Sequence, residues 1–263
     1  MKRILACLIL LWPCVPVAAD AGAWTLPGDA AQILAGVFAT RASEQFDNRG
    51  HPSRAIAFTK IYTQIYAEYG WTDDLTLIAA PEFEMAKWRS PGSAPSAKWD
   101  VALSGGMRYR LFSSFGTLSV EGSLKNAGAY DEAAIVGGSL SHSREIELQL
   151  LYGTNFTLAG YDGFADVEAG HRWITNNGAN QVPADITLGV HLTPTLLVLV
   201  QSFNVVSTRP EPGLGRYRSH KLALSVVQAL GDRLSLQVGG FYAPFGQNSL
   251  QEQGVMASLW ARF

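Results

Sequence analysis

Hydrophobic and polar residues alternate with a period of two along much of the chain. In the stretch TKIYTQIYAEYG (residues 59–70), Ile61 and Ile65 fall on one face of an extended segment, and Lys60 and Gln64 fall on the other. The same alternation recurs in EIELQLLYG and in DITLGVHL. Such a pattern predicts β-strands that present an apolar face and a polar face.

The alternation extends over twelve long segments, which we predict as strands. They cover residues 30–46, 54–70, 74–89, 97–112, 115–126, 141–156, 161–175, 184–192, 195–208, 216–230, 232–244 and 251–263. Short turns alternate with longer polar loops between them, and the longer loops are expected at 47–53, 90–97, 126–140, 175–183, 208–215 and 245–250. The repetition predicts an all-β, up-and-down antiparallel transmembrane β-barrel. The segment AAIVGGSL (133–140) could form two further strands, making fourteen, but we expect it to be part of a loop.

The beginning of the chain has the features of a secretory signal peptide. A positively charged pair, a short apolar run and a small-residue cleavage position follow one another at 2–3, 4–12 and 17–19, with later cleavage alternatives at Ala21 and Ala23. We therefore expect residues 1–19 to be a cleaved signal peptide and residues 20–263 to form one barrel domain. Both cysteines, Cys7 and Cys14, fall inside the predicted signal peptide, so the mature chain would contain no disulfide.

Composition narrows the class of protein further. Charged residues make up 16% of the chain, below the roughly 25% of soluble domains. No segment after the predicted signal reaches about 18 consecutive apolar residues, so helical membrane spans are not expected. Without Lys2 and Arg3 the chain holds 18 basic and 22 acidic residues. That balance, without a basic stripe, argues against nucleic acid as a partner and fits a barrel in the bacterial outer membrane, reached through the periplasm.

The chain ends in MASLWARF, and the alternation continues to the last residue. Apolar residues occupy every second position from Val255 to Phe263. A barrel must close its last strand on its first, because an open sheet edge is not tolerated in lipid. We expect Phe263 to act as the signal by which a barrel-assembly machinery recognises the chain, and outer-membrane lipids to be partners of the folded barrel.

Several stretches together resemble a known family. They are AGAWTLP, AEYGWTDDLTL, ELQLLYG, VEAGHRW, QSFNVVS and LWARF. The pattern resembles proteobacterial outer-membrane β-barrel proteins akin to those named for the phenol meta-cleavage (MetA) pathway. The resemblance extends over the whole mature chain and implies the barrel fold. Its motifs are structural, and it implies no catalytic residues.

The alternation also assigns side chains to the barrel interior. Charged groups at membrane depth belong inside a barrel, where water or partners satisfy them. The predicted lumen-lining residues are Glu82, Glu84, Arg108, Arg110, Glu121, Glu147, Asp166, Glu168 and Arg172. The acidic members would form one wall, whereas strands 195–208, 216–230 and 232–244 carry few charges and would form an apolar wall. Two interpretations remain open: a selective channel or binding pore for a small aromatic or amphipathic solute, and an interaction barrel filled by its own charge network.

An enzymatic function is not expected. The cluster Ser141-His142-Ser143 is the closest pairing of serine and histidine, but neighbouring residues on a strand point to opposite faces. A lipid-modifying enzyme is therefore a distant alternative. The five histidines are too scattered for metal-ligand spacing, and we expect neither a metal nor a cofactor.

Overall fold

The structure is a computed structural model that describes residues 22–126, 144–175, 178–210 and 215–263. The described residues form twelve β-strands. These strands are β1 (Ala31–Phe46), β2 (Pro52–Thr72), β3 (Leu75–Arg89), β4 (Ser96–Phe112), β5 (Thr117–Lys125), β6 (Glu145–Leu158), β7 (Tyr161–Ile174), β8 (Gln181–Thr193), β9 (Leu196–Ser207), β10 (Arg218–Ala229), β11 (Leu234–Gln247) and β12 (Leu250–Arg262).

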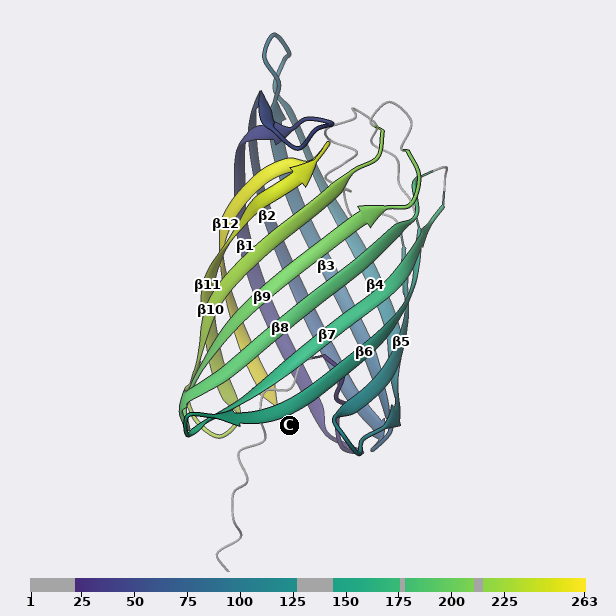
Figure 1. Ribbon diagram of the computed structural model, residues 1–263, viewed down its shortest axis with the longest axis vertical. Helices are drawn as coiled ribbons and strands as arrows, with labels where there is room; N and C mark the ends of the chain where they lie inside the picture. The colour runs from purple at the N-terminus through teal and green to yellow at the C-terminus, as the bar shows by residue number, and fades with distance from the viewer. Residues whose placement is uncertain (1–21, 127–143, 176–177, 211–214) are drawn as a thin grey trace, which may run out of the picture.

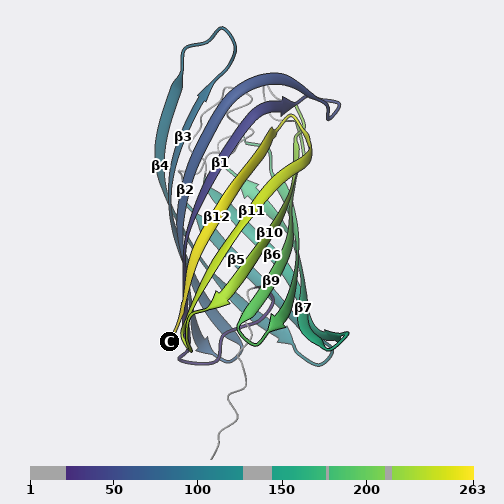
Figure 2. The ribbon, with the colours of Figure 1, turned by 90° about the vertical axis from the view of Figure 1, so that its left-hand side faces the viewer.

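Each strand pairs antiparallel with its neighbours in sequence, and β1 pairs with β12 to close the barrel (Figures 1 and 2). At the closing seam Gln32 lies opposite Arg262, and the backbones of Ala31 and Phe263 exchange two hydrogen bonds of 3.2 and 2.9 Å. The prediction of a closed up-and-down barrel is confirmed. We call the end that holds Phe263 and the short turns the turn end, and the opposite end the loop end.

Two strands are longer than the sequence pattern predicts, and each continues through a proline. β8 begins at Gln181 and includes Pro183, although the strand was expected to start at 184. β11 continues through Pro244 to Gln247, so the predicted loop 245–250 is wrong and Asn248 and Ser249 make a tight turn. In β11 a bulge opposite β10, between His220 and Leu222, accommodates the proline, because a bulged residue does not need a ladder hydrogen bond.

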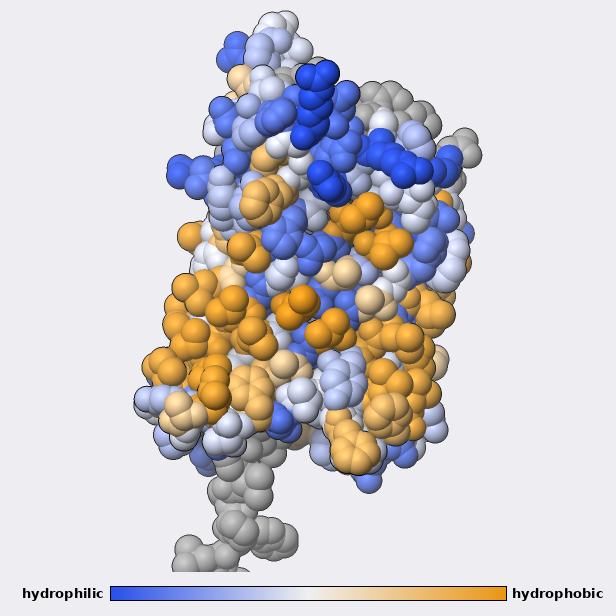
Figure 3. All heavy atoms as spheres, viewed as in Figure 1, coloured by the Kyte–Doolittle hydropathy of each residue, from blue (hydrophilic) through white to orange (hydrophobic). Residues whose placement is uncertain are grey.

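The outward face of the barrel is apolar over a broad belt. Large hydrophobic side chains of consecutive strands point away from the lumen, and Leu150 and Leu224 are more than half exposed. Figure 3 shows this belt in orange over the lower part of the molecule, with a hydrophilic zone at the loop end. A water-soluble protein does not expose so much continuous apolar surface, so this face is suited to lipid.

Aromatic side chains border the belt at both ends. Trp71, Phe115 and Phe263 are highly exposed at the turn end, and Trp99 and Phe245 are highly exposed toward the loop end. Aromatic girdles of this kind sit at the two interfaces of a bilayer. The belt and girdles establish the fold class as a transmembrane β-barrel. Among the described residues, no helix has the length and apolarity needed to cross a membrane.

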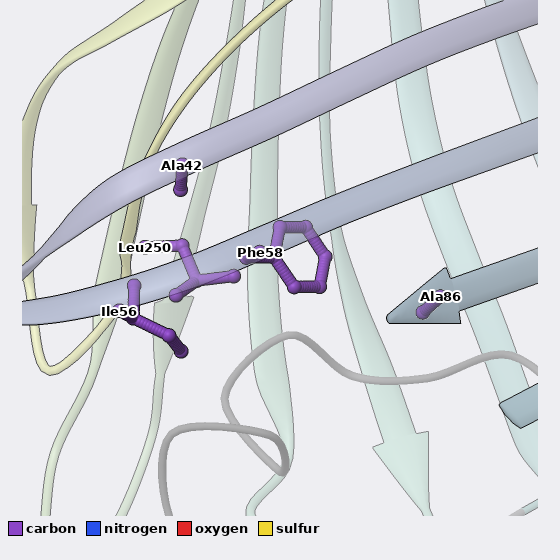
Figure 4. Packing of buried hydrophobic residues seen from close by; sticks show 5 residues of the cluster. All are labelled: Ala42, Ile56, Phe58, Ala86 and Leu250. Atoms are coloured by element: carbon purple, nitrogen blue, oxygen red, sulfur yellow. The ribbon is translucent and has the colours of Figure 1, made fainter. Parts of the chain in front are cut away.

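An apolar cluster packs inside the barrel near the loop end (Figure 4). Ile56 and Phe58 of β2 lie against Ala42 of β1, Ala86 of β3 and Leu250 of β12. Phe58 and Leu250 are each 1% exposed. The charged lining predicted for the lumen therefore lies below this cluster, toward the middle of the barrel.

Three sequence-based predictions concern residues outside the described ranges. They are the signal peptide at 1–19, the alternative strands at 133–140 and the serine–histidine cluster at Ser141 to Ser143.

Candidate lumenal binding site

A cavity of about 670 Å³ occupies the lumen. A volume of this size is in the range of small-molecule sites. Two different walls surround it. The polar wall comes from β2 to β5, β7 and β8, and its lining residues include Lys60, Tyr62, Gln64, Tyr66, Glu82, Glu84, Arg108, Glu121, Lys125, Asp166, Glu168, Asp185 and Thr187. The apolar wall comes from β1 and β9 to β12, and it includes Leu34, Phe38, Leu199, Phe203, Ala223, Phe241, Met256 and Trp260.

Arg108 of β4 organises the polar wall. Its guanidinium forms ion pairs with Glu121 on the neighbouring strand β5 (2.8 Å) and with Glu68 on β2 (3.0 Å), which lies two strands away on the other side of β4. It also donates a hydrogen bond of 3.1 Å to the hydroxyl of Tyr66, which itself donates to Glu68. Arg108 is 3% exposed. The planar guanidinium suits this role because it donates in several directions at once.

A second set of contacts extends the polar wall toward the loop end. The ammonium of Lys125 lies 2.6 Å from a carboxylate oxygen of Glu82, and the amide of Gln64 donates to the other oxygen over 3.0 Å. Lys125 of β5 thus reaches past β4 to Glu82 of β3, and Lys125, Glu82 and Gln64 all line the cavity.

The apolar wall also carries polar side chains, and two of them form a local chain of hydrogen bonds with Trp260. The indole N–H of Trp260 donates to Gln237 over 3.2 Å, and the amide of Gln237 donates to Ser225 over 2.9 Å. Lys221 is the one charged side chain that this wall contributes to the cavity lining, and it is ion-paired with Glu252. A ligand in the cavity would meet aromatic and aliphatic surface on this side.

The chain preceding β1 folds back into the barrel at the turn end (Figure 1), and its residue Gly22 lines the cavity there, so we call this end of the cavity its floor. The backbone N–H of Ala23 donates to Asp166 on β7 over 2.8 Å, and its carbonyl accepts from Ser119 on β5. The carbonyl of Trp24 accepts from Arg108 over 2.9 Å. These contacts tie the segment 22–26 to strands on several sides of the barrel.

Trp24 anchors this segment by packing. Its ring meets the ring of Phe164 edge to face, with centroids 5.8 Å apart, and it packs on the buried cluster that includes Leu197 and Trp260. Gly153 on β6 makes room for it, because a Cβ atom there would lie 2.5 Å from a carbon of the indole ring. The segment therefore narrows the passage through the turn end.

The structure separates the nine predicted lumen residues into two groups. Glu82, Glu84, Arg108, Glu121, Asp166 and Glu168 line the cavity together. Three others lie outside it. Arg110 pairs with Asp74 of the β2–β3 turn at 2.6 Å, and Arg172 pairs with Glu147 at 2.7 Å.

Sequence reasoning missed several members of the cavity wall. Asp185, Tyr62 and Tyr66 line the cavity, and Asp185 accepts the backbone N–H of Asn204 over 2.9 Å. Their positions have the same inward phase as the residues that were selected, so the alternation could have identified them. The segment 22–26 gave no periodic signal.

Within the described residues, 22–126, 144–175, 178–210 and 215–263, no three His, Cys, Asp or Glu side chains lie close enough together to hold a metal ion.

Sequence comparison with known proteins finds no relative of the chain. No protein-family model matches the chain, and no curated protein matches it. The family resemblance noted from the sequence therefore remains a prediction.

Solved structures are nevertheless similar to it. An outer membrane channel from Pseudomonas putida F1 superposes with a TM-score of 0.68 at 15% identity, covering 93% of this chain and 99% of that one. The translocator domain of the autotransporter NalP from Neisseria meningitidis gives a TM-score of 0.60 at 12% identity, covering 90% and 89%. The β domain of the Bordetella autotransporter Brka gives 0.57 at 17% identity, covering 89% and 100%. The chain thus shares the fold of bacterial outer-membrane barrels.

Proposed function

We propose that the protein is a channel or binding pore of the bacterial outer membrane, with its turn end in the periplasm, that accepts a small amphipathic solute. The observation that carries this proposal is the two-walled cavity of about 670 Å³. A solute with a polar part and an aromatic or aliphatic part could satisfy both walls at once. The lipid-suited belt and the similarity to outer-membrane barrels support the location.

The charges around the cavity favour a cationic polar part. Six acidic side chains and four basic ones line it. The acidic excess attracts cations and raises their local concentration in the lumen. The aromatic residues Phe38, Phe203 and Phe241 on the apolar wall favour an aromatic or aliphatic apolar part. The proposed function contains no catalytic step.

Single-channel conductance of the refolded protein in a planar bilayer tests the proposal. The double variant Glu84→Gln/Glu121→Gln removes two cavity charges, and Glu44→Gln removes an exposed carboxylate outside the cavity as a matched control. We expect discrete conductance steps with a preference for cations that falls in the double variant and not in the control.

A bilayer without conductance steps would contradict the channel, provided that heat-modifiable gel mobility shows a folded barrel. The ion-pair network around Arg108 and the segment 22–26 would then favour the second function, an interaction barrel whose lumen is filled.

A further inference from the structure

We propose that the chain is cleaved between Ala21 and Gly22, and that the new α-ammonium group of Gly22 forms an ion pair with Asp166 and Glu168 inside the lumen. The step is a hydrolysis by a signal peptidase. One water molecule is consumed, the Ala21–Gly22 peptide bond breaks, and an Ala21 carboxylate and a Gly22 amine form, the latter taking up a proton. The inference concerns maturation, and it does not depend on the proposed solute.

The contacts of Gly22 carry this inference. Asp166 is 2% exposed and accepts the backbone N–H of Ala23 over 2.8 Å. Its carboxyl group lies so close to Gly22 that a Cβ atom built there would be 2.5 Å from Oδ1. The nitrogen of Gly22 is bonded to the same Cα from which that Cβ position is built, so the carboxyl group of Asp166 lies beside the residue that would carry the new amine.

The local charges call for a cation at this position. Asp166 and Glu168 are two residues apart on β7, line the same cavity and interact with each other. Arg108 acts electrostatically on both, and its guanidinium is already ion-paired with Glu68 and Glu121. Four carboxyl groups thus share one guanidinium. A positive partner stabilises buried carboxylates, and an α-ammonium on Gly22 would supply one.

The sequence before Gly22 fits a cleavage at this bond. Ala19-Asp20-Ala21 has the small residues that signal peptidase requires three residues and one residue before the cut. Cleavage after Ala19 would leave Asp20, a further carboxyl group, on the mature chain. Cleavage after Ala23 would remove the residue whose N–H binds Asp166 and whose carbonyl binds Ser119. Of the three possible sites, cleavage after Ala21 is the one that keeps the contacts of Ala23 and places the new amine on Gly22.

The first test is the intact mass of the full-length protein after export to the outer membrane and purification. A mature chain that starts at Gly22 is expected. A chain that starts at Asp20 or at Trp24 would overturn the proposal.

The second test measures whether the α-amine is paired. An aldehyde reagent selective for N-terminal amines is applied near neutral pH to the folded protein that starts at Gly22. Pairing that stabilises the ammonium by one pKa unit lowers the reactive fraction about tenfold. We expect the double variant Asp166→Asn/Glu168→Gln to react at least about tenfold faster, and Asp162→Asn, which changes an exposed acid on the same strand, to react like the wild type.

A refolded chain that starts at Asp20 keeps the test decisive if the double variant does not fold. Its amine would stand away from Asp166 and should react as fast as that of an unstructured peptide. If the wild-type amine at Gly22 reacts equally fast, the ion pair does not exist and the proposal is overturned.

Discussion

Two arginines of β4 show how strongly burial changes the contribution of an ion pair to stability. Arg108 and Arg110 point to the same face of the strand, two residues apart. Arg108 is buried between Glu68 and Glu121, whereas Arg110 pairs with the half-exposed Asp74 at the turn end. Removing one partner of a buried pair leaves uncompensated charge, but an exposed pair contributes little.

We therefore expect Arg108→Met to lower the free energy of unfolding by about 3–5 kcal/mol and Arg110→Met to lower it by about 0–1 kcal/mol. Urea titration of the refolded proteins in detergent, followed by tryptophan fluorescence, measures the difference. Equal losses in the two variants would contradict the central role of Arg108.

Asp47, in the loop after β1, allows a prediction about pH. Its carboxylate accepts the backbone N–H groups of His51 (2.9 Å) and Arg49 (2.8 Å), and these hydrogen bonds lower the pKa of Asp47 below its ordinary value of 3.8. The folded loop binds the charged form, so its stabilisation is complete above pH 3.8 and is lost as the pH falls through the lowered pKa. Carbon-detected NMR titration should give a midpoint below 3.8. A midpoint at or above that value would show that the loop does not hold the carboxylate.

At the scale of the strands, the period-two pattern predicts the fold well because lipid and lumen impose opposite requirements on successive residues. Strand ends are harder to predict where proline occurs. Pro183 and Pro244 suggest strand breaks, yet both lie within strands, since at Pro244 a bulge removes the need for its missing N–H. Local residue preference does not reveal such a bulge, because it depends on the neighbouring strand.

The packing of Trp24, in the segment 22–26, against Gly153 of β6 can be tested by substitution of that glycine. Gly153→Val would place its side chain where the ring of Trp24 now lies, and overpacking of this kind costs about 1–3 kcal/mol. We expect the segment to be displaced and single-channel conductance to rise. Gly122→Val is the control, because a Cβ atom there meets only Leu148 at an ordinary 3.9 Å. An unchanged conductance in Gly153→Val would show that the segment does not limit passage.

For the whole molecule, the sequence predicts which way a side chain points but not how deep it lies in the barrel. Depth depends on the register between strands, so Glu147 and Arg172 pair with each other away from the cavity that Asp166 and Glu168 line. The cavity floor was also not predictable, since Ala23 and Asp166 are 143 residues apart in sequence. Contacts between residues so far apart in sequence form only when the barrel closes, so no local sequence pattern indicates them.

Closure gives a prediction about Phe263. Its backbone N–H donates to Ala31 over 2.9 Å at the seam, while its side chain is 67% exposed. Phe263→Ala keeps the backbone bond, so refolding in detergent should be unchanged. If a barrel-assembly machinery recognises the side chain, the amount of heat-modifiable barrel in cell membranes should be severalfold lower for Phe263→Ala than for the wild type. Equal amounts of the variant and the wild type in membranes would exclude that role.

The two-walled lumen has a consequence for molecules of equal size and charge. The contrast between carboxylates and hydrocarbon lies across the bore, because the polar wall runs from β2 to β8 and the apolar wall runs from β9 round to β1. A solute can use both walls only if its own polar and apolar sides are arranged to match. Positional isomers of one ring compound would then differ in their affinity for the cavity and in their rate of entry, so the barrel would distinguish solutes by the arrangement of their polar and apolar groups.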